Sequence, residues 1–377
     1  MLFHEARPLL PDGPLRQFAA NGFIGVGLFY VLSGFILAYT YLDPRDAQPI
    51  EKPKFWRARF ARVYPVYLLA LVVALPLFLP WGIQKLTASG MIEPTKAIVT
   101  AVANVALLQA WLPQTVSQWN APGWSLSVEG FFYLVFPVIA VALTRKTNRT
   151  IALWAGAVWL AGMLVALVFL VAHPEMWRGG EPADVTTGLL FLKFVPPQHL
   201  PEFLIGTGCG IFFLRRSSER RPSLGSPAAV SMAVALVLGV ILAAPRQLPY
   251  PLLHSGVLAP LFALLILSLA SERGPLAAIL QRPTLVLLGK ASYAIYLLHE
   301  PLAAIMYKTA WSPFRELDPR LRFVLYLGVV IAVSVAVLYW YEEPARRFIR
   351  NLGGRGGRPA RQKSQVALGP VPAEKSG

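Results

Sequence analysis

Charged residues are scarce in this sequence. Asp, Glu, Lys and Arg make up 14% of the 377 residues, whereas soluble domains carry roughly 25%. Hydrophobic residues make up 55%, and the mean hydropathy over the whole chain is +0.53. One globular core cannot hold that much apolar surface. The composition therefore excludes a set of soluble domains and indicates a polytopic membrane protein.

Cysteine is nearly absent as well, since Cys209 stands alone in the sequence. One cysteine cannot form a disulfide within the chain, and it excludes a cysteine-ligated zinc or iron–sulfur site. The five histidines show no HExxH spacing, and the sequence contains neither a P-loop nor a Gly-x-Ser-x-Gly elbow. We therefore expect no metal site and no phosphate-cradling glycine loop.

Apolar segments long enough to cross a bilayer recur along the chain. A hydrocarbon core about 30 Å thick requires about 20 mostly apolar residues per helix. A shorter apolar stretch, 97–112, contains Asn104 and Gln109, so we expect it to lie on or dip into the outer surface. The sequence predicts an all-α integral membrane bundle with nine spans, at roughly 22–42, 64–81, 127–143, 151–172, 201–214, 228–244, 255–271, 285–307 and 323–341.

Lys and Arg are distributed unevenly between the segments that separate these spans. Because basic residues gather in cytoplasmic loops, the richer segments are placed inside, together with the C-terminus. The surplus of basic residues, which gives a net charge of +16, then records orientation in the membrane and not nucleic-acid binding. The segments 43–63, 144–150, 215–227, 272–284 and 342–377 hold 23 of the 35 basic residues, against 9 in the alternate segments.

The N-terminus does not fit this topology. Nine crossings with the C-terminus inside leave Met1 outside, yet residues 1–21 contain no basic region followed by an apolar core, as a signal peptide would. A first helix is therefore missing from the count. We expect the true start codon to lie upstream of Met1.

Three arginines lie at the cytoplasmic entrance of the second span. Arg59 and Arg62 are three residues apart and share a helix face, whereas Arg57 lies on a different side. The planar donor fork of arginine suits phosphate groups. On charge alone, however, these arginines are explained as ordinary cytoplasmic anchors, flanked by the interfacial aromatics Trp56 and Tyr64.

Ionisable residues also occur inside the predicted spans. Glu129 lies in the first turns of an otherwise uncharged helix, where it either faces a polar cavity or interacts with the helix N-terminus. His299 lies about 21 Å along its helix at 1.5 Å per residue, in the outer half. It is either a hydrogen-bonded packing residue or catalytic, and the adjacent Glu300 favours a polar cavity. Glu343 closes the last span beside two arginines, a pattern typical of a structural salt-bridge cluster.

Together these segments resemble the acyltransferase 3 family of bacterial membrane acyltransferases. The resemblance extends from Gly22 to about Arg347, and it implies ten helices, one of them upstream of Met1. It also implies transfer of an acyl group from cytoplasmic acyl-CoA to an extracytoplasmic sugar, lipid or small molecule. The motifs that carry it are Gly25–Phe35, Arg57–Pro65, Trp124–Tyr133, Ser292–His299 and Glu343-Pro344, in the family's order.

The resemblance implies a donor site at the arginines. Arg57, Arg59 and Arg62 match the family's arginine motif and would contact the phosphates of CoA. Ala58 stands where a further arginine is often found, which implies a leaner phosphate site. Ser33, in the first matched motif, is placed among the supporting residues.

The resemblance also implies catalytic residues. Glu129 matches the family's important acid, Tyr133 its accompanying tyrosine, and His299 the histidine of the ninth family helix. His4 matches the histidine that ends the first family helix, by its distance from Gly25. The arginine that the family places about ten residues earlier would precede Met1.

We therefore predict an O-acetyltransferase that uses acetyl-CoA as donor substrate and binds no cofactor. A neutral imidazole with an unperturbed pKa of about 6.5 suits a general base near pH 7, so His4 is expected to remove the proton of the acceptor hydroxyl. Glu129 would orient His4 or stabilise its imidazolium, and His299 would polarise the thioester carbonyl. Glu343 is a further supporting residue.

The expected partners are acyl-CoA, a carbohydrate or lipid-linked acceptor and membrane lipid. Residues 1–21 are the expected remnant of the first family helix and its outer loop, 22–347 the acyltransferase domain, and 348–377 a disordered basic cytoplasmic tail. The predicted location is the bacterial inner membrane. The alternative is a polytopic carrier or flippase for a glycan or small solute, in which the same charges line a transport path.

Overall fold

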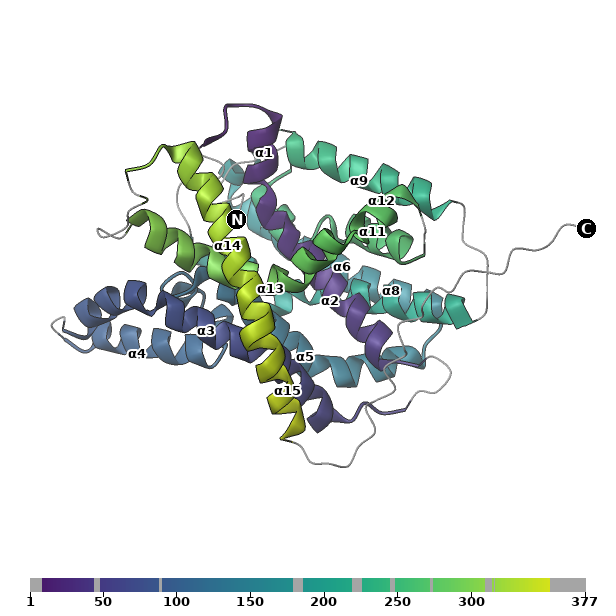
Figure 1. The fold of residues 1–377 in the computed structure, drawn as a ribbon. Helices are drawn as coiled ribbons and strands as arrows, with labels where there is room; N and C mark the ends of the chain where they lie inside the picture. The colour runs from purple at the N-terminus through teal and green to yellow at the C-terminus, as the bar shows by residue number, and fades with distance from the viewer. Residues whose placement is uncertain are drawn as a thin grey trace, which may run out of the picture.

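The protein folds into a bundle of helices in a computed structural model (Figure 1). The structure describes residues 9–43, 48–87, 90–178, 186–218, 226–244, 248–271, 274–308, 314 and 316–352. Across these ranges the regular elements are helices, with no β-strand. The prediction of an all-α membrane bundle is therefore confirmed.

Helices occupy all nine of the predicted spans. By length and composition, six segments of the described chain could cross a membrane: Gly22–Tyr41, Lys52–Leu86, Ala121–Thr144, Asn148–Ala172, Tyr250–Ser271 and Pro319–Asn351. The principal helices are α2 (Gly25–Tyr41), α3 (Lys52–Leu86), α5 (Trp124–Thr144), α6 (Asn148–Ala172), α8 (Leu200–Ser218), α9 (Pro227–Ala243), α11 (Ala259–Ser271), α13 (Pro283–Lys308) and α14 (Pro319–Val337). The shorter ones are α1 (Pro14–Ala20), α4 (Ile92–Val105), α7 (Thr187–Phe194), α10 (Tyr250–His254), α12 (Pro275–Leu280) and α15 (Glu343–Asn351).

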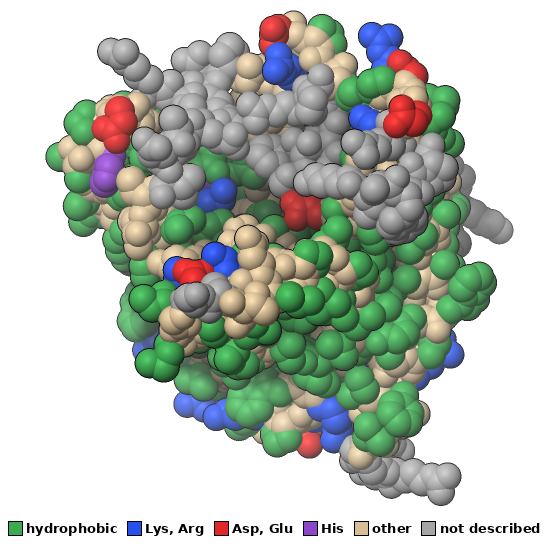
Figure 2. All heavy atoms as spheres, turned by 90° about the vertical axis from the view of Figure 1, so that its left-hand side faces the viewer, with side chains coloured by type: hydrophobic (Ala, Val, Ile, Leu, Met, Phe, Trp, Pro, Cys, Tyr) green, Lys and Arg blue, Asp and Glu red, His purple; other side chains and the backbone are tan. Residues whose placement is uncertain are grey.

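The surface of the bundle is apolar over a broad area. Figure 2 shows hydrophobic side chains across the middle of one face, with Lys and Arg side chains along its lower edge. Leu153, Leu160 and Leu164 on α6 are each at least 60% exposed. Exposed leucines in a continuous field match a surface that contacts lipid.

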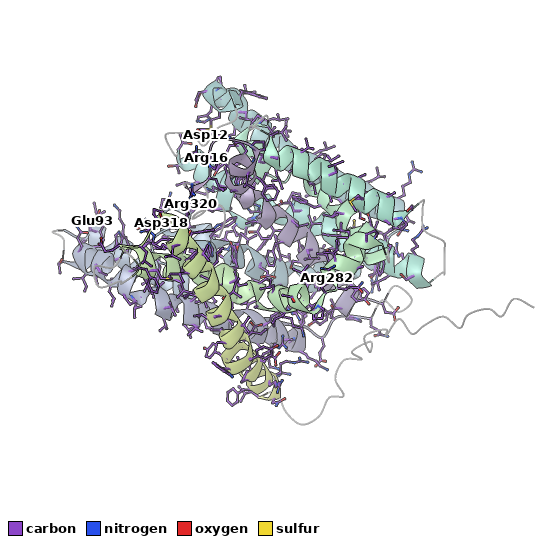
Figure 3. The ribbon with its side chains drawn as sticks, turned by 45° about the horizontal axis from the view of Figure 1, so that its top comes forward. Asp12, Arg16, Glu93, Arg282, Asp318 and Arg320 are labelled. Carbon is purple, nitrogen blue, oxygen red and sulfur yellow. The ribbon has the colours of Figure 1, made fainter. Side chains whose placement is uncertain are left out.

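Charged residues of different connecting segments separate toward different ends of the bundle. In Figure 3, Glu93 and Asp318 lie near each other at the left, and Arg282 lies well to their right. Glu93 and Asp318 belong to segments that the charge distribution places outside, and Arg282 to one that it places inside. Asp318 also caps α14, because its Oδ1 accepts hydrogen bonds from the backbone amides of Arg320 and Leu321.

The closest helix pair in the bundle is α2 with α8, and small residues make it possible. A Cβ on Gly34 would meet the backbone carbonyl of Phe203 and lie 2.8 Å from the Thr207 amide nitrogen. Gly206 and Gly210 of α8 likewise face the backbone of α2. Such contacts let two helix backbones approach within a membrane. This packing fixes the face of α2 that carries the candidate site.

Helix α3 is longer than its predicted span. Its 35 residues measure about 52 Å at 1.5 Å per residue, more than a bilayer core. Helix α4 runs antiparallel beside it: Lys85 contacts Glu93 at 2.5 Å, and the Tyr64 hydroxyl donates to the Val105 carbonyl at 3.0 Å. The segment that we expected over 97–112 is thus helical over Ile92–Val105 and dips along α3 toward the middle of the bundle (Figure 1).

Candidate active site

Glu129 lies at the centre of the bundle, in the second turn of α5. Its side chain is 5% exposed. The Tyr133 hydroxyl, one turn later on the same helix, donates to Oε1 at 2.5 Å, and the Ser33 hydroxyl of α2 donates to the same oxygen at 3.3 Å. A buried carboxylate requires such partners. The structure therefore brings together three of the predicted site residues, from two helices.

Arg59 approaches this carboxylate from α3, by way of aromatic rings. Its Nη2 donates to the Tyr41 hydroxyl at 3.0 Å, and the guanidinium carbon lies 5.2 Å from the Tyr41 ring centroid and 5.9 Å from that of Tyr133. Both distances are within cation–π range. Tyr133 thus touches both Arg59 and Glu129. The buried Nε of Arg59 has no hydrogen-bond partner among the residues that the structure describes.

Arg62 is close enough to two acids to interact electrostatically with both. Its charge acts on Glu129 and on Glu342, the last residue of a π-helix over Leu338–Glu342. Glu342 is 5% exposed, whereas Glu343 forms a more exposed bridge of 3.1 Å to Arg347. The π-helix widens the last turn before α15 and directs Glu342, which our sequence interpretation did not select, toward the arginines.

Two predicted residues stand apart from this cluster. Arg57 makes no hydrogen bond or ion pair to any described residue. His299, on α13, is 3% exposed, and its Nδ1 lies 2.6 Å from the Tyr296 carbonyl. A carbonyl only accepts, so Nδ1 carries the proton and Nε2 is the basic nitrogen of the neutral ring. His4 lies outside the described residues.

The start of α5 is held by a buried polar network. Gln109 donates to the Gly123 carbonyl at 2.7 Å and to the Tyr67 hydroxyl at 3.1 Å, and Tyr67 donates to the Asn104 carbonyl at 2.6 Å. A Cβ on Gly123 would lie 2.8 Å from the Tyr67 ring. The dipping segment therefore fixes where α5 begins, and with it the position of Glu129.

Sequence reasoning missed a second buried ionisable pair, His199 and Glu202. These residues are 2% exposed, and Nδ1 of His199 lies 3.1 Å from Oε2 of Glu202. Their positions, three apart at the start of α8, could have suggested a shared face. Two glycines make room for the side chain of Glu202. A Cβ on Gly27 would lie 2.5 Å from the Glu202 Oε1, and a Cβ on Gly256 would lie 2.6 Å from the Glu202 Cγ. Gly256 also adopts a φ of +80°, which favours glycine.

Tyr30 on α2 lies between the two buried acids. Its ring centroid is 5.0 Å from that of His199 and 5.2 Å from that of Phe132. Its hydroxyl is near enough to Glu202 and Glu129 to interact electrostatically with both. The side chain is fully buried, and the hydroxyl makes no hydrogen bond within the described part of the chain.

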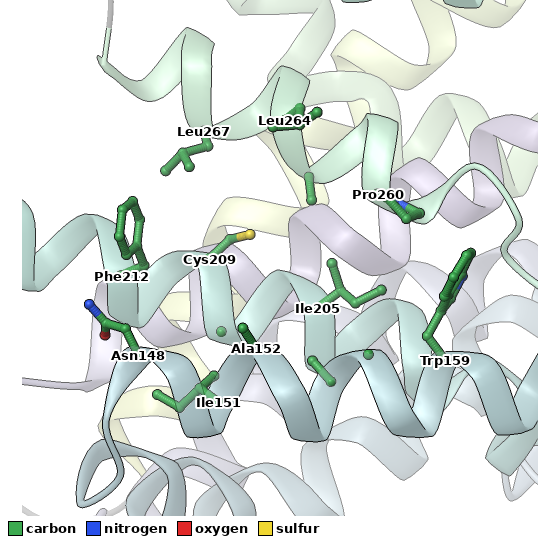
Figure 4. Close-up of a pocket in the computed structure, with 14 residues that line it drawn as sticks. Asn148, Ile151, Ala152, Trp159, Ile205, Cys209, Phe212, Pro260, Leu264 and Leu267 are labelled. Carbon is green, nitrogen blue, oxygen red and sulfur yellow. The ribbon is translucent and has the colours of Figure 1, made fainter. Parts of the chain in front are cut away.

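A separate cavity of about 480 Å³ opens between α6, α8 and α11 (Figure 4). Its walls are apolar and include Ile151, Trp159, Ile205 and Cys209. None of the polar residues described above lines it. The candidate site is therefore the polar cluster around Glu129, and this cavity is separate from it. Within the described ranges, no group of three or more His, Cys, Asp or Glu side chains could hold a metal.

The long apolar helices and the apolar surface define the chain as a multi-pass membrane protein. Residues 1–339 match the model of the acyltransferase 3 family, described as an acyltransferase domain. The chain belongs to this family, as its motifs indicated, and is an acyltransferase. No solved structure matches it significantly.

Curated relatives point to the same activity. The chain is 31% identical over 289 residues to acyltransferase MdmB of Streptomyces mycarofaciens. The matched region covers 76% of this chain and 69% of the relative. It is 24% identical over 354 residues to peptidoglycan O-acetyltransferase OatA of Listeria monocytogenes, covering 88% and 52% of the two chains. For O-acetyltransferase OatA of Staphylococcus aureus the identity is 26% over 308 residues, with 76% and 47% covered. The chain thus spans about half the length of the OatA relatives.

Proposed function

We propose that this protein is a membrane O-acetyltransferase that moves an acetyl group from acetyl-CoA, at the inner face of the bacterial inner membrane, to a hydroxyl of an extracytoplasmic carbohydrate or glycolipid. The observation that carries the proposal is a chain of contacts from an arginine to a buried carboxylate. Arg59 lies over the ring of Tyr133, and the Tyr133 hydroxyl donates to Glu129. The printed names of the OatA relatives support acetyl as the acyl group.

The donor would bind at the arginines. Arg59 is held against aromatic rings and has a buried Nε without a partner among the described residues, so it offers donors to an anion. Arg62 lies exposed beside it. Arg57, two residues earlier and half-buried, completes the proposed phosphate site. Planar guanidinium groups bind phosphates with two parallel hydrogen bonds.

The transfer requires one proton acceptor. The hydroxyl oxygen attacks the thioester carbon, the carbon–sulfur bond breaks, and the CoA thiolate takes up the proton that the hydroxyl loses. We assign the removal of that proton to His4. Glu129 would orient His4 or stabilise its imidazolium, with Ser33 and Tyr133 holding the carboxylate.

Two further groups are assigned supporting roles. His299 would polarise the thioester carbonyl through Nε2, which requires the imidazolium form because its Nδ1–H already donates a hydrogen bond to the Tyr296 carbonyl within α13. Glu343 would hold the inner end of the last helix through its bridge to Arg347. We propose a cytoplasmic C-terminus, because α15 carries Arg346, Arg347 and Arg350. Helix α15 extends to Asn351, so the chain is helical past position 348, where the tail was expected to begin.

Labelled acetyl-CoA tests this proposal. Wild-type protein in vesicles should move the label into a membrane-impermeant glycan on the opposite side. An unmodified glycan that crosses the membrane without gaining label would instead identify a carrier. His4→Ala should abolish transfer while the protein remains folded, and full activity in that variant would refute the assignment of the base.

Arg59→Ala should raise KM for acetyl-CoA by about 10- to 100-fold, because hydrogen bonds to charged groups contribute about 1.5–3 kcal/mol. Arg62→Ala should act in the same direction. Lys54→Ala is the matched control. Lys54 is another cation near the start of α3, and it contacts only Glu51 at 3.6 Å among the described residues. An unchanged KM in Arg59→Ala would remove the arginines from the donor site.

A further inference from the structure

The Tyr30 hydroxyl is one of the buried polar groups without a hydrogen-bond partner in the described part of the chain, and it lies near the candidate site. Tyr30 is 0% exposed, and its hydroxyl has no hydrogen-bond partner among the described residues. A buried hydroxyl without a partner costs about 1–3 kcal/mol. Such a cost is expected where a ligand supplies the missing partner.

The surroundings of Tyr30 are polar on two sides. Toward the inner end of α2, Ser33 follows one turn later and donates to Glu129. Toward the outer end, Gly27 precedes it by one turn and faces the carboxyl of Glu202. Because i±3 positions share a helix face, Tyr30 lies on the same face of α2 as Gly27 and Ser33, which contact the two acids. Its hydroxyl interacts electrostatically with both of them.

The neighbouring His199 cannot itself accept the proton of a substrate. Its Nε2 lies 2.9 Å from the Lys193 carbonyl, which only accepts, so Nε2 carries a proton. Its Nδ1 and the Glu202 carboxyl, 3.1 Å apart, share one further proton. The pair is then neutral overall, and both ring nitrogens are occupied. Its role is to hold a ring against Tyr30, at 5.0 Å between centroids.

We infer that Tyr30 is a catalytic residue whose hydroxyl donates a hydrogen bond to the carbonyl oxygen of the transferred acyl group. A phenol with an ordinary pKa near 10 is protonated at neutral pH, so it is available as a donor. When the acceptor oxygen bonds to the thioester carbon, the π electron pair of the carbonyl moves onto the carbonyl oxygen, to which Tyr30 donates its hydrogen bond. Collapse of the adduct restores the carbonyl and releases CoA as thiolate.

The assignment rests on the proposed function and adds a second hydrogen-bond donor to the carbonyl oxygen, besides the role proposed for His299. A donor fixed in a water-excluded site stabilises this charge more than it stabilises the ground-state carbonyl. His199 and Glu202 are positioning residues in this account. They act through Tyr30 and do not contact the substrate.

Tyr30→Phe separates this role from a structural one. The variant keeps the ring contacts and loses only a hydroxyl that has no protein partner, so its melting temperature should equal or exceed that of the wild type. Its kcat should fall about 100-fold, the usual effect of removing one oxyanion donor. KM for acetyl-CoA should stay within about 2-fold, because the nucleotide binds elsewhere.

A binding experiment gives a readout that does not depend on turnover. The probes are S-ethyl-CoA, which has a methylene in place of the carbonyl, and the ketone isostere of acetyl-CoA, in which methylene replaces sulfur. Wild-type protein should bind the ketone about 5-fold more tightly, the effect of one hydrogen bond of about 1 kcal/mol. Tyr30→Phe should lose this 5-fold contribution to the binding of the ketone.

Tyr326→Phe is the matched control. Tyr326 is equally buried, but its hydroxyl donates to the His299 carbonyl at 3.0 Å. This variant should lose thermal stability and keep the preference for the ketone. Tyr30→Phe with wild-type kcat, or with a lowered melting temperature, would overturn the inference.

The outcomes distinguish the inference from the function on which it rests. If the wild type transfers acetyl groups but binds both analogues equally, the role of Tyr30 is wrong and the proposed function stands. If the wild type binds neither analogue and transfers no label, both are wrong.

Discussion

Replacing Gly34 by alanine should disturb the contact that aligns α2 with α8. The added methyl group would meet the Phe203 carbonyl and lie 2.8 Å from the Thr207 amide nitrogen, closer than Cβ atoms approach other atoms. Both neighbours are backbone atoms of α8, so no side-chain rotation can relieve the contact. The helices must separate, and overpacking of this kind costs about 1–3 kcal/mol.

Gly239→Ala is the matched control in an apolar helix. Gly239, on α9, has no atom within 4 Å of its hypothetical Cβ. Its replacement should stabilise the protein by about 0.5–1 kcal/mol, the difference in helix propensity between glycine and alanine. Both substitutions add one methyl group, but they should change the free energy of unfolding in opposite directions.

Thermal denaturation of the detergent-solubilised protein, with acetyl transfer measured in parallel, tests this prediction. Gly34→Ala should melt below the wild type and Gly239→Ala at or above it. Transfer by Gly34→Ala should fall as well, since Ser33 is the adjacent residue and its 3.3 Å hydrogen bond to Glu129 depends on the position of α2. Equal melting temperatures for the two variants would show that α2 and α8 are not in tight contact.

Two other parts of the bundle carry predictions. Gln109→Ala should lower the free energy of unfolding by about 1–3 kcal/mol, because the buried Gly123 carbonyl loses its hydrogen-bond donor. Denaturation measures this change, and an unchanged stability would contradict the role of the Gln109 hydrogen bonds at the start of α5. The ammonium groups of Lys85 and Lys96 lower the pKa of Glu93 to about 2 from an ordinary 4.5. Their contribution to stability is therefore complete above about pH 4.5 and is lost as the pH falls through 2. Hydrogen-exchange protection at the α3–α4 tip, relative to the intrinsic exchange rate at each pH, should fall over that interval, and Lys85→Ala should move this fall to higher pH.

Much of the candidate site could be predicted because its residues lie in local motifs. Glu129 and Tyr133 are four apart on one helix, so their contact follows from helix geometry. The sequence named Ser33 and Arg59 as site residues but did not place them beside Glu129. The structure brings Ser33 to the acid by a hydrogen bond and connects Arg59 to it through the rings of Tyr41 and Tyr133.

The residues that were missed depend on irregular backbone. His199 follows two prolines in a segment without helical periodicity, so the sequence places it in an outer loop, yet the 3₁₀ turn Pro196–His199 leads directly into α8 and buries it. Glu342 is buried because a π-helix interrupts the end of α14. Neither a 3₁₀ turn nor a π-helix leaves a clear hydrophobic period, and periodicity is the signal on which span prediction depends.

In the proposed function, the arrangement along α2 would allow a cytoplasmic donor and an external acceptor to meet. Gly27, Tyr30 and Ser33 lie on one face and point in turn to Glu202, to the space between the acids and to Glu129. Tyr41, at the inner end, contacts Arg59. Gly27 to Tyr41 is about 21 Å along the helix, most of the depth of a bilayer core. One rigid helix, locked to α8 by glycine contacts, therefore sets the spacing between the arginine entrance and the outer His199–Glu202 pair. In the proposed function, an acyl donor bound at Arg59 would extend along α2 and bring its acyl group to Tyr30. An acceptor would then have to enter only from the outer side.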